Sequence, residues 1–567
     1  MTTSLHPSAH VDHWPRQQLP PAAEWPVLDL EPPYAYPARL NAATRLLDDA
    51  VAEGHGDRVA LVVPRATGAT SASGAASATG AGGSSGAWRD VTYRELAAQV
   101  DAIAHVLVDD LHLVPGNRVL LRGFNGQLMA AAWLATLKAG MVAVTTMPLL
   151  RAKELGVIIE RAQCTAALCD ARLLDELKQA VRAPLGVEAI RSWGHDGVDS
   201  LEALTATRHT PFTAVTTSSD DVCLIAFTSG TTGVPKGCMH FHRDVMAMSD
   251  GFASQVVGLR PDDRCLGTPP LAFTFGLGGL LTFPLAARAS TVLVEKATPE
   301  TLLETVAATH ATVTWTAPTF YRAMSLAMKK EPGRFDTSSL RASVSAGEAL
   351  PDATRTLWRD ATGIEMLDGI GATELIHIFI AAAGKDVRHG AIGRAVPGYA
   401  VAILDDELQP LPVGEVGRLA VRGPTGCRYM NDPRQRDYVR GGWNLTGDAA
   451  SMDADGYVFF KARTDDLILS SGYNIGAPEV EAAVLQHTDV AECAVVGVPD
   501  IERGQAVKAF VVLKAGITGD DTLAHAIQDF VKATIAPYKY PRVVEFVAAL
   551  PKTDTGKLQR FRLKESK

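Results

Sequence analysis

The sequence predicts an α/β protein whose large N-terminal domain contains doubly wound, mainly parallel sheets. From residue 118 to residue 169, short apolar runs alternate with stretches of helical periodicity. Such alternation over short connections is typical of βαβ units, with helices on both faces of a sheet. Beyond Gly414 the sequence becomes rich in short strands separated by Gly, Asp and Pro, which indicates a small β-rich subdomain followed by a compact α+β unit.

Two or more domains are expected, because 567 residues exceed the length of one ordinary domain. The N-terminal domain would comprise residues 1–464, with the β-rich subdomain at residues 414–464. The C-terminal domain would comprise residues 465–567.

The first strands of the N-terminal domain are expected at residues 59–63 and 88–92. Residues 66–87 between them contain only Ala, Thr, Gly and Ser, and this composition buries too little apolar surface to offset the entropy of ordering. We therefore expect a flexible surface loop that replaces a short hairpin turn and has no part in function.

The spacing of apolar residues predicts the elements that follow. Leu96, Val100, Ile103 and Leu107 recur at helical spacing. Further helices are expected at residues 128–138 and 152–162, and further strands at residues 118–121, 141–146, 165–169, 222–227, 291–295, 312–315, 342–345 and 364–367.

Charge and composition exclude several classes of partner. The net charge of -9 comes without a block of basic residues, which argues against nucleic acid or an anionic membrane as the main partner. The seven cysteines form no C-x-x-C pair, and the N-terminus lacks the apolar segment of a secretory signal. No apolar run approaches the ~18 residues that span a bilayer. We expect a cytoplasmic protein that binds a small molecule.

Residues 226–237 (AFTSGTTGVPKG) predict a phosphate-binding loop. Glycines let main-chain N–H groups approach an oxyanion, hydroxyl side chains add donors, and Lys236 supplies positive charge. The loop follows the strand expected at 222–227, at the carboxyl end where open α/β sheets bind ligands. It does not match the P-loop pattern, because Gly237 follows the lysine. The residues expected to contact the nucleotide are Thr228, Ser229, Gly230, Thr231, Thr232, Gly233 and Lys236.

Four further segments contain residues suited to a nucleotide or a metal ion. In DGIGATE at residues 368–374, Thr373 is placed to hold a phosphate, and Glu374 is a hard oxygen donor suited to Mg²⁺. Taken alone, a Thr-Glu pair after glycine is more typical of a helix start. The other three segments, which alone are solvated turns or a basic tail, are TGD at 446–448, RTDD at 463–466 and PKTDTGKLQR at 551–560.

Together and in this order, the five segments resemble those of the adenylate-forming enzymes: acyl- and aryl-CoA synthetases, peptide-synthetase adenylation domains and luciferases. The resemblance covers the chain from about residue 35 to its end. It implies a large N-terminal domain with a mobile C-terminal lid, and ATP, Mg²⁺ and CoA as cofactor and co-substrates. It also implies two steps, in which a carboxylate first attacks the α-phosphate of ATP and a thiol then displaces AMP.

The resemblance also assigns roles to individual residues. Lys557 would neutralise charge during adenylate formation, and Asp465 would be the hinge about which the lid turns. The turn would bring residues 470–476 (SSGYNIG) to the site, where Gly472 and Tyr473 would line a tunnel for CoA. The remaining roles are adenine contact for Gly347, Glu348, Asp368 and Gly369, α-phosphate contact for Thr373, Mg²⁺ binding for Glu374, and ribose binding for Asp448 and Arg463.

The acyl pocket is expected to favour an aromatic acid. Phe273 and Phe275, within PPLAFTFGLGG at residues 269–279, offer flat apolar walls with glycines behind them, a shape suited to a planar ring. The alternative is that both phenylalanines are core residues. The other residues expected to line the pocket are Ala346, Ile370, Gly371 and His377.

Two segments, PPLAFTFGLGG and IGATELIHIFIAAAG, look most like those of benzoate- and 2-aminobenzoate-CoA ligases, and LPPAAEWP with YPARLNAATRLLD leans toward the aminobenzoate branch. In this interpretation His377 faces the ring substituent, although a lone histidine among apolar residues is more often part of the core. We expect an AMP-forming acid–thiol ligase that acts on 2-aminobenzoate or benzoate in the degradation of aromatic compounds.

Three alternatives remain. A medium-chain acyl-CoA synthetase would use the same chemistry with another acid, and a stand-alone adenylation enzyme would load a separate carrier protein. A non-catalytic nucleotide-binding protein is disfavoured, because Glu374 and Lys557 are both present. A homodimer is kept as a hypothesis.

Overall fold

A computed structural model of the protein describes residues 5–65, 87–181, 189–228, 235–470, 473–500, 503–535, 537–552 and 558–565. The chain divides into two compact units: residues 1–400 with 422–444, and residues 401–421 with 445–567. Residues 414–421 and 445–464 of the expected β-rich segment therefore group with the C-terminal residues by their contacts, whereas residues 422–444 group with the first unit. This division follows from contacts between residues and does not locate a hinge. The domain boundary and the hinge expected at Asp465 therefore stay predictions.

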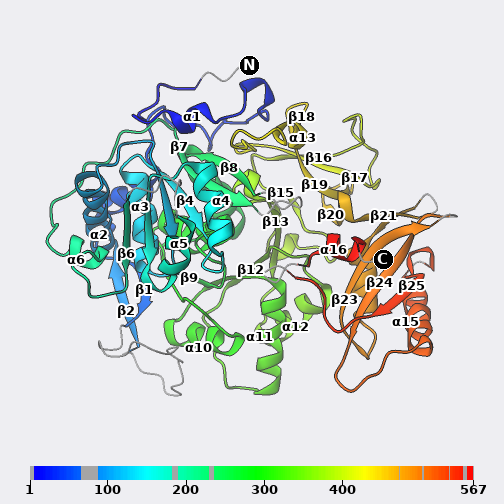
Figure 1. Ribbon diagram of the computed structural model, residues 1–567. Coiled ribbons are helices and arrows are strands. Elements are labelled where there is room, and N and C mark those ends of the chain that lie inside the picture. The colour runs from blue at the N-terminus through cyan, green and yellow to red at the C-terminus, as the bar shows by residue number, and fades with distance from the viewer. Residues whose placement is uncertain are drawn as a thin grey trace. The chain divides into compact units, whose positions relative to one another are not determined.

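The first unit contains a six-stranded sheet in which only the edge strand β8 is antiparallel. Figure 1 shows its strands at the cyan and green end of the unit. In spatial order they are β6 (Ala189–Trp193), β5 (Ala166–Asp170), β3 (Arg118–Arg122), β4 (Val142–Thr146), β7 (Val222–Thr228) and β8 (Lys236–Phe241).

Helices cover both faces of this sheet, as a doubly wound fold requires. Side chains alternate along a strand, so Val119 and Leu121 of β3 pack in one apolar cluster with α3 (Gln127–Lys138). Leu120 between them packs in another cluster with α4 (Ala152–Ala162). The strands and helices expected between residues 118 and 169 are confirmed.

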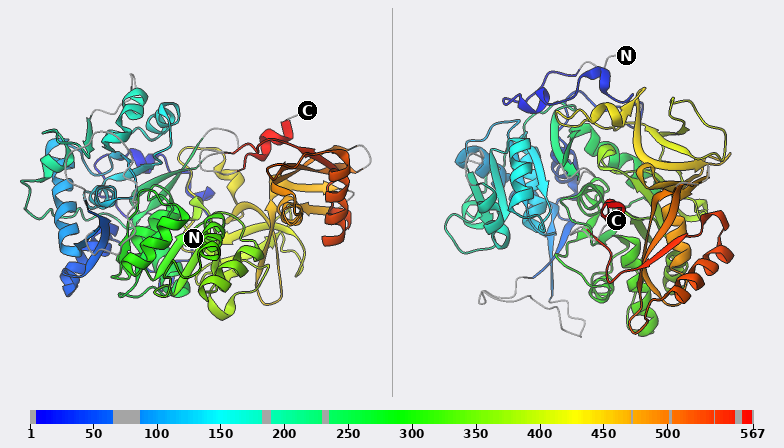
Figure 2. Two further views of the ribbon diagram at one scale, coloured as in Figure 1. Left: turned by 90° about the horizontal axis from the view of Figure 1, so that it is seen from below. Right: turned by 45° about the vertical axis from the view of Figure 1, so that its right-hand side comes forward.

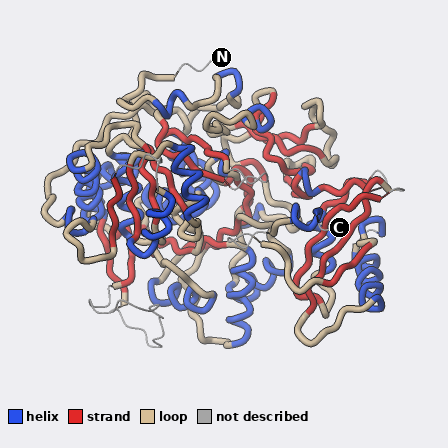
Figure 3. Tube along the Cα trace, viewed as in Figure 1, coloured by secondary structure: helices blue, strands red, loops and turns tan. Residues whose placement is uncertain are grey.

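A nine-stranded sheet forms the rest of the first unit, parallel from β13 to β1 and antiparallel at its two edges. Figure 3 colours the strands of both sheets red and the helices around them blue. In spatial order they are β15 (Arg394–Ala395), β14 (Ile378–Ala382), β13 (Leu367–Gly371), β12 (Ala342–Ala346), β11 (Val313–Thr316), β9 (Arg264–Gly267), β10 (Ser290–Val292), β1 (Val59–Pro64) and β2 (Trp88–Thr92).

Three helices pack in one apolar cluster on one face of this sheet, and they are α10 (Pro299–Thr309), α11 (Pro318–Lys330) and α12 (Asp352–Thr362). The other face packs against η6 (Ser249–Val257), η7 (Gly278–Thr282) and α9 (Phe283–Ala286). The predicted α/β class with mainly parallel sheets is therefore confirmed.

One predicted strand was misplaced. The expected strand at 364–367 overlaps the observed β13 only at Leu367. Residues 367–371 (LDGIG) contain two glycines and an aspartate, which are poor strand formers. They form a strand because β12 and β14 supply hydrogen bonds on both sides, so tertiary pairing outweighs local propensity.

The strands β1 and β2 pair antiparallel as predicted, with Pro64 opposite Trp88. The loop expected at residues 66–87 lies almost wholly outside the described residues. Replacing it with a short turn should leave kcat and the KM for each substrate within about twofold of the parent values, because loop length costs little and the ends already meet. Steady-state kinetics of the shortened protein check this, and a KM for ATP raised about fivefold or more would contradict it.

The helix expected from Leu96 to Leu107 begins earlier, as α2 (Tyr93–His105). The side chain of Thr92 accepts a hydrogen bond from the main chain of Glu95, and Glu95 accepts one in return. This capping box fixes the start of the helix.

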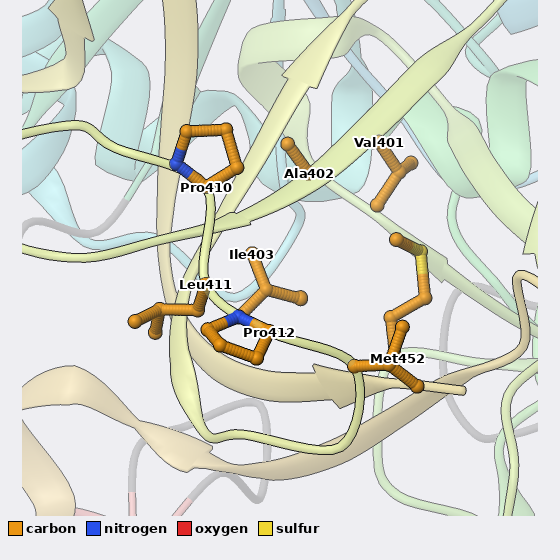
Figure 4. A pocket seen from close by; sticks show the side chains of 8 residues that line it. Val401, Ala402, Ile403, Pro410, Leu411, Pro412 and Met452 are labelled. Carbon is orange, nitrogen blue, oxygen red and sulfur yellow. The ribbon is translucent and has the colours of Figure 1, made fainter. Parts of the chain in front are cut away.

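A small five-stranded sheet contains, in spatial order, β16 (Ala400–Leu404), β17 (Gly417–Arg422), β19 (Trp443–Met452) and β18 (Val439–Arg440), and β20 (Val458–Arg463) pairs antiparallel with β19. Figure 4 shows an apolar hollow beside it, lined by residues that include Val401, Pro410 and Met452. Its volume of about 100 Å³ is too small for an acyl-adenylate, and none of the predicted site residues lines it.

The α+β unit expected near the C-terminus is present. Its sheet has the order β22-β21-β24-β23, with β25 paired to β24. Figure 2 gives two views of α15 and α16 against this sheet, and Val495 packs with α15 while its neighbours Ala494 and Val496 pack with α16. The elements are β21 (Leu467–Ser470), β22 (Tyr473–Gly476), α14 (Ala477–Val484), β23 (Val490–Asp500), β24 (Gly504–Leu513), α15 (Asp521–Thr534), β25 (Val543–Phe546) and α16 (Arg560–Glu565).

Among the described residues, no helix combines the length and the apolar composition needed to cross a membrane.

Candidate active site

The predicted phosphate loop connects two strands of the six-stranded sheet. Thr228 ends β7 and Lys236 begins β8, and the two residues face each other across the pair. The hydroxyl of Thr228 is buried and has no hydrogen-bond partner within the described chain, so among these residues it is a donor without an acceptor. Five of the predicted contacts lie outside the described residues, and they are Ser229, Gly230, Thr231, Thr232 and Gly233.

Lys236 and Glu374 are brought together by a tyrosine. The ammonium Nζ of Lys236 donates to the hydroxyl of Tyr429 at 2.6 Å, and that hydroxyl donates to Oε1 of Glu374 at 2.5 Å. Nζ of Lys236 also lies 3.5 Å from Oε1 of Glu374 and 4.5 Å from the centre of the Tyr429 ring. Burial, and then the Glu374 carboxylate, raise the pKa of Tyr429 far above its usual range, so the phenol stays protonated.

Main-chain pairing holds Tyr429 in this place. Residues 428–430 run beside β8, where Met239 and Met430 each donate a main-chain hydrogen bond of 2.8 Å across the two segments. The N–H of Tyr429 donates to Oε1 of Gln435 at 2.8 Å. The Tyr429 side chain is fully buried, so its hydroxyl is fixed by the surrounding chain.

Glu374 follows β13 in a short turn, η8 (Thr373–Leu375), beside the end of β7. The hydroxyl of Thr425 donates to the carbonyl of Leu375 at 2.9 Å and anchors this turn. The carboxyl ends of strands from both sheets therefore meet at Glu374, as expected for an α/β ligand site.

The residues expected to flank adenine gather at the ends of β12 and β13. Ala346 pairs with Gly369, and Ser345 pairs with Asp368. Gly347, next along the chain, has a φ of 91° and open space where a Cβ would stand, and Glu348 beside it is exposed. Burial raises the pKa of the Asp368 carboxyl to about 7, with the charge of Arg355 opposing this shift.

The predicted ribose residues lie in the second unit. Asp448 of β19 faces Arg463 of β20 in the antiparallel register, and Nη1 of Arg463 lies 2.9 Å from Oδ1 of Asp448. Nη1 also donates to the carbonyl of Thr446 at 2.8 Å. The two predicted residues are thus brought together.

A cluster of aromatic rings surrounds His377. Its ring centre lies 4.5 Å from that of Phe283, 5.6 Å from Phe252 and 5.8 Å from Phe275. Trp315 contacts the same three phenylalanines. Burial lowers the pKa of His377 to about 3, although the main chain of Phe275 opposes part of the shift. The ring is therefore neutral, and neither nitrogen has a side-chain partner among the described residues.

Small residues let this cluster form. A Cβ on Gly278 would stand 2.6 Å from the His377 ring, and a Cβ on Gly279 would stand 2.6 Å from the Trp315 ring. Contacts this short are not tolerated, so both positions exclude any larger residue. The glycines expected behind the pocket wall thus lie directly against aromatic rings.

The two phenylalanines of the predicted pocket wall differ in their burial. Phe275 contacts His377 and Trp315, whereas Phe273 has 38% of its surface exposed. Phe273 precedes α8 (Thr274–Leu277), and its side chain is turned to solvent rather than buried in the cluster, because successive residues at a helix start point in different directions. Of the other expected pocket residues, Ile370 and Gly371 end β13, and Gly371 lies against the main chain of His377.

Residues 47–429 match the family model described as AMP-binding enzyme, and residues 479–557 match the one described as AMP-binding enzyme C-terminal domain. The chain belongs to the AMP-binding enzyme family. The predicted membership of the adenylate-forming superfamily is thereby confirmed.

Relatives within the AMP-binding family include aryl-CoA ligases. The chain is 36% identical to the benzoate–CoA ligase of Thauera aromatica over 84% of this chain and 90% of that protein. It superposes on the anthranilate CoA ligase AuaEII in complex with anthranoyl-AMP with a TM-score of 0.83 and 33% identity, over 93% and 97% of the two chains. For the benzoate CoA ligase from Burkholderia xenovorans LB400, the TM-score is 0.79 and the identity 29%, over 93% and 100%. The expected enzyme class, an AMP-forming CoA ligase, is confirmed at the level of the family.

The family implies Mg²⁺, and the residues present fit this ion. No group of three His, Cys, Asp or Glu side chains able to hold a metal occurs in the described part of the chain. Mg²⁺ is commonly bound through one or two carboxylates together with substrate phosphates and water. Glu374, with its orientation restrained by Tyr429, provides one such carboxylate.

The C-terminal residues implied by the resemblance are less completely described. Asp465 lies in η10 (Thr464–Asp466), and Tyr473 begins β22. Gly472 and Lys557 lie outside the described residues. Their functional assignments stay predictions.

Sequence reasoning missed Tyr429 and three aromatic rings of the His377 cluster, namely Phe252, Phe283 and Trp315. In the sequence each one reads as an isolated apolar residue of a strand, helix or loop. They come together only through strand pairing and helix packing, so no local pattern marks them.

Proposed function

We propose that this AMP-binding enzyme is an ATP-dependent aryl-CoA ligase. It activates an aromatic carboxylate as acyl-AMP with release of pyrophosphate, and it transfers the acyl group to the thiol of CoA, which gives acyl-CoA and AMP. The observation that carries the proposal is the closeness in sequence of a charged pair and an aromatic cluster. Glu374, paired with Lys236, is separated by only two residues from His377, whose ring lies among the phenylalanines.

Charge neutralisation is the main requirement of the first step. A carboxylate and a triphosphate repel each other, so in-line attack on the α-phosphorus needs cationic groups and hydrogen-bond donors that stabilise the developing charge. Lys236, Thr228 and the rest of the loop would contact the β- and γ-phosphates, and Lys557 would act where the carboxylate attacks. Mg²⁺, when bound through Glu374, would supply further positive charge.

The second step needs a different arrangement. A thiol must reach the acyl-adenylate while water is kept away from it, which favours a closed site. We propose that the C-terminal lid turns about Asp465, withdraws Lys557 and presents Gly472 and Tyr473 to the pantetheine arm of CoA. A glycine at position 472 suits this role, because the arm could then pass close to the main chain.

The acid is proposed to be 2-aminobenzoate or benzoate. Planar rings and glycines around His377 suit a flat ring better than a flexible chain, which loses rotamer freedom on binding. His377 is neutral and buried, so one ring nitrogen is an acceptor that an ortho-amino group could satisfy. Either acid should therefore release pyrophosphate from ATP much faster than octanoate does, in a screen over substituted benzoates and medium-chain acids.

Replacing His377 with Phe should reduce kcat/KM for 2-aminobenzoate more than for benzoate. Leaving the buried amino group without an acceptor costs about 1–3 kcal/mol, which corresponds to roughly five- to a hundredfold. The measurement is kcat/KM for both acids by pyrophosphate release. Phe252→Leu is the matched control, because Phe252 also contacts His377 but has no polar atom, so both acids should lose activity equally.

Comparable losses for both acids in His377→Phe would make His377 a packing residue. Preference for octanoate over both aromatic acids would overturn the proposed substrate class and favour a medium-chain acyl-CoA synthetase. Transfer to a separate carrier protein but not to free CoA would favour a stand-alone adenylation enzyme. A homodimer and a role in the degradation of aromatic compounds remain proposals, and sedimentation of the purified protein tests the first.

A further inference from the structure

The bridge from Lys236 through Tyr429 to Glu374 contains a residue to which the two-step chemistry gives no role. Tyr429 is fully buried, yet its hydroxyl is not part of a purely structural network. It contacts the cation that follows the phosphate loop at 2.6 Å and the carboxylate proposed to bind Mg²⁺ at 2.5 Å. A residue bonded to both groups can affect how each one meets the nucleotide.

The direction of the hydrogen bonds gives Tyr429 two separate functions. A phenol carries one proton and also accepts hydrogen bonds. Lys236 has only donors, so the Tyr429 oxygen accepts from it and the phenol proton must point to Oε1 of Glu374. The lysine is thereby held beside the carboxylate, and rotation of the carboxylate is restrained.

The surroundings make this arrangement stiff. The Tyr429 ring packs edge-on against Tyr438, with centres 5.6 Å apart, and Gln435 holds its main chain. The Nε2 of Gln435 in turn donates to the carbonyl of Glu24 at 2.8 Å. Because these contacts fix the Tyr429 hydroxyl, it can position Lys236 and Glu374.

We propose that Tyr429 is a positioning residue for magnesium–nucleotide binding, which holds Lys236 and Glu374 together before the nucleotide arrives and keeps Glu374 oriented afterwards. This inference rests on the proposed function, since it uses the assignment of Lys236 to phosphate and of Glu374 to Mg²⁺. When the nucleotide binds, Lys236 leaves the Glu374 carboxylate and contacts a phosphate instead. Glu374 would then contact the divalent cation in place of the Lys236 ammonium and would keep its hydrogen bond to the Tyr429 hydroxyl. Residues that hydrogen-bond to a metal ligand commonly orient it in this way.

Tyr429→Phe removes the hydroxyl and keeps the ring. The test is the affinity for ATP measured by calorimetry in the absence of acid and CoA, once with Mg²⁺ and once with EDTA. In the wild type, Mg²⁺ should increase the affinity for ATP. In Tyr429→Phe this increase should fall about tenfold or more, because a hydrogen bond to a charged group is lost and Glu374 is no longer restrained.

Tyr321→Phe is the matched control. Tyr321 is also fully buried, and its hydroxyl oxygen lies 3.0 and 3.1 Å from the carbonyl oxygens of Thr314 and Val344, either of which can accept its proton. Losing that hydroxyl should lower thermal stability and leave the effect of Mg²⁺ on ATP affinity unchanged. An unchanged effect in Tyr429→Phe as well would make Tyr429 a packing residue and overturn the proposal.

A double-mutant cycle with Glu374→Gln covers the case in which Tyr429→Phe does not fold, because the double variant leaves no buried carboxylate without its donor. In the Glu374→Gln background, Tyr429→Phe should change ATP affinity less than twofold or so, since the group that Tyr429 orients is already gone. A loss of about tenfold or more in that background would overturn the proposal.

These outcomes are distinct from failure of the proposed function. The binding measurement needs neither acid nor CoA, so a wrong acid in the pyrophosphate screen overturns the ligase proposal and leaves the Tyr429 result standing. If Mg²⁺ brings the wild type no gain in ATP affinity, the Tyr429 proposal is wrong, whereas the ligase proposal still depends on the pyrophosphate screen.

Discussion

Lys557→Ala is expected to slow adenylate formation from acid and ATP by about a hundred- to a thousandfold, the range found for one electrostatic donor in a transition state. Thioester formation from supplied acyl-adenylate and CoA should stay within about twofold of the wild type, because the lysine would act only in the first transition state and be withdrawn before the second. Single-turnover measurements of the two half-reactions check this directly.

Lys552→Ala is the control for Lys557→Ala. Lys552 is only five positions away in the sequence, and its Nζ lies 2.6 Å from a carboxylate oxygen of Glu492 in the same unit. Its loss should leave both half-reactions nearly unchanged, since surface ion pairs contribute little. Equal losses in both half-reactions of Lys557→Ala would refute the assignment of this lysine to adenylate formation.

Local patterns were sufficient to predict most of the fold. The helix expected at residues 152–162 coincides with α4, because its apolar residues lie on one face. Strands such as β4 and β5 were predicted within one residue at each end, since they are apolar runs bounded by polar residues. The strand at residues 367–371 was placed wrongly, because its formation depends on two neighbouring strands and not on its own residues.

The same distinction between local pattern and long-range pairing applies to the residues of the candidate site. Residues in contiguous motifs, such as Thr228, Lys236 and Glu374, could be predicted because glycine, hydroxyl, lysine and carboxylate have recognisable chemistry at short spacing. Tyr429 could not, because its contacts span 193 residues to Lys236 and 55 to Glu374. The same reason hid the ion pair of Arg428 with Asp244, which are 184 residues apart.

That ion pair supports the second prediction with a large effect, which concerns stability. Nη1 of Arg428 lies 2.8 Å from Oδ2 of Asp244, and both side chains are completely buried. The main-chain N–H of Phe241 donates to the same Oδ2 at 2.9 Å, and the guanidinium lies over the Phe241 ring with its carbon 4.1 Å from the ring centre. The pair thus fastens the segment that contains Tyr429 to the helix that follows β8.

Arg428→Met should destabilise the first unit by about 3–5 kcal/mol at pH 7.5, because it leaves a buried carboxylate without its cation. The apparent Tm in calorimetry should fall by about 5–10 °C. Arg334→Met is the control, since Arg334 and its partner Glu304 are both exposed, and it should leave the Tm nearly unchanged because exposed ion pairs contribute little to stability.

The pH dependence of this loss distinguishes an electrostatic cause from a simple loss of packing. In the wild type, burial alone would raise the pKa of Asp244, but Arg428, with help from His240 and Arg243, lowers it to about 2. The pair therefore contributes stability above the ordinary carboxyl pKa, and this contribution is lost only as pH falls toward 2. Without Arg428, burial pushes the pKa of Asp244 upward. The variant therefore loses most stability at neutral pH and regains stability as the carboxyl takes up a proton.

The Tm difference between Arg428→Met and the wild type should accordingly be smaller at pH 5 than at pH 7.5, and Asp244→Asn in the Arg428→Met background should regain part of the loss at pH 7.5. A Tm difference that is the same at both pH values, with no recovery in the double variant, would mean that Arg428 stabilises the unit through its contacts with Phe241 rather than through its charge.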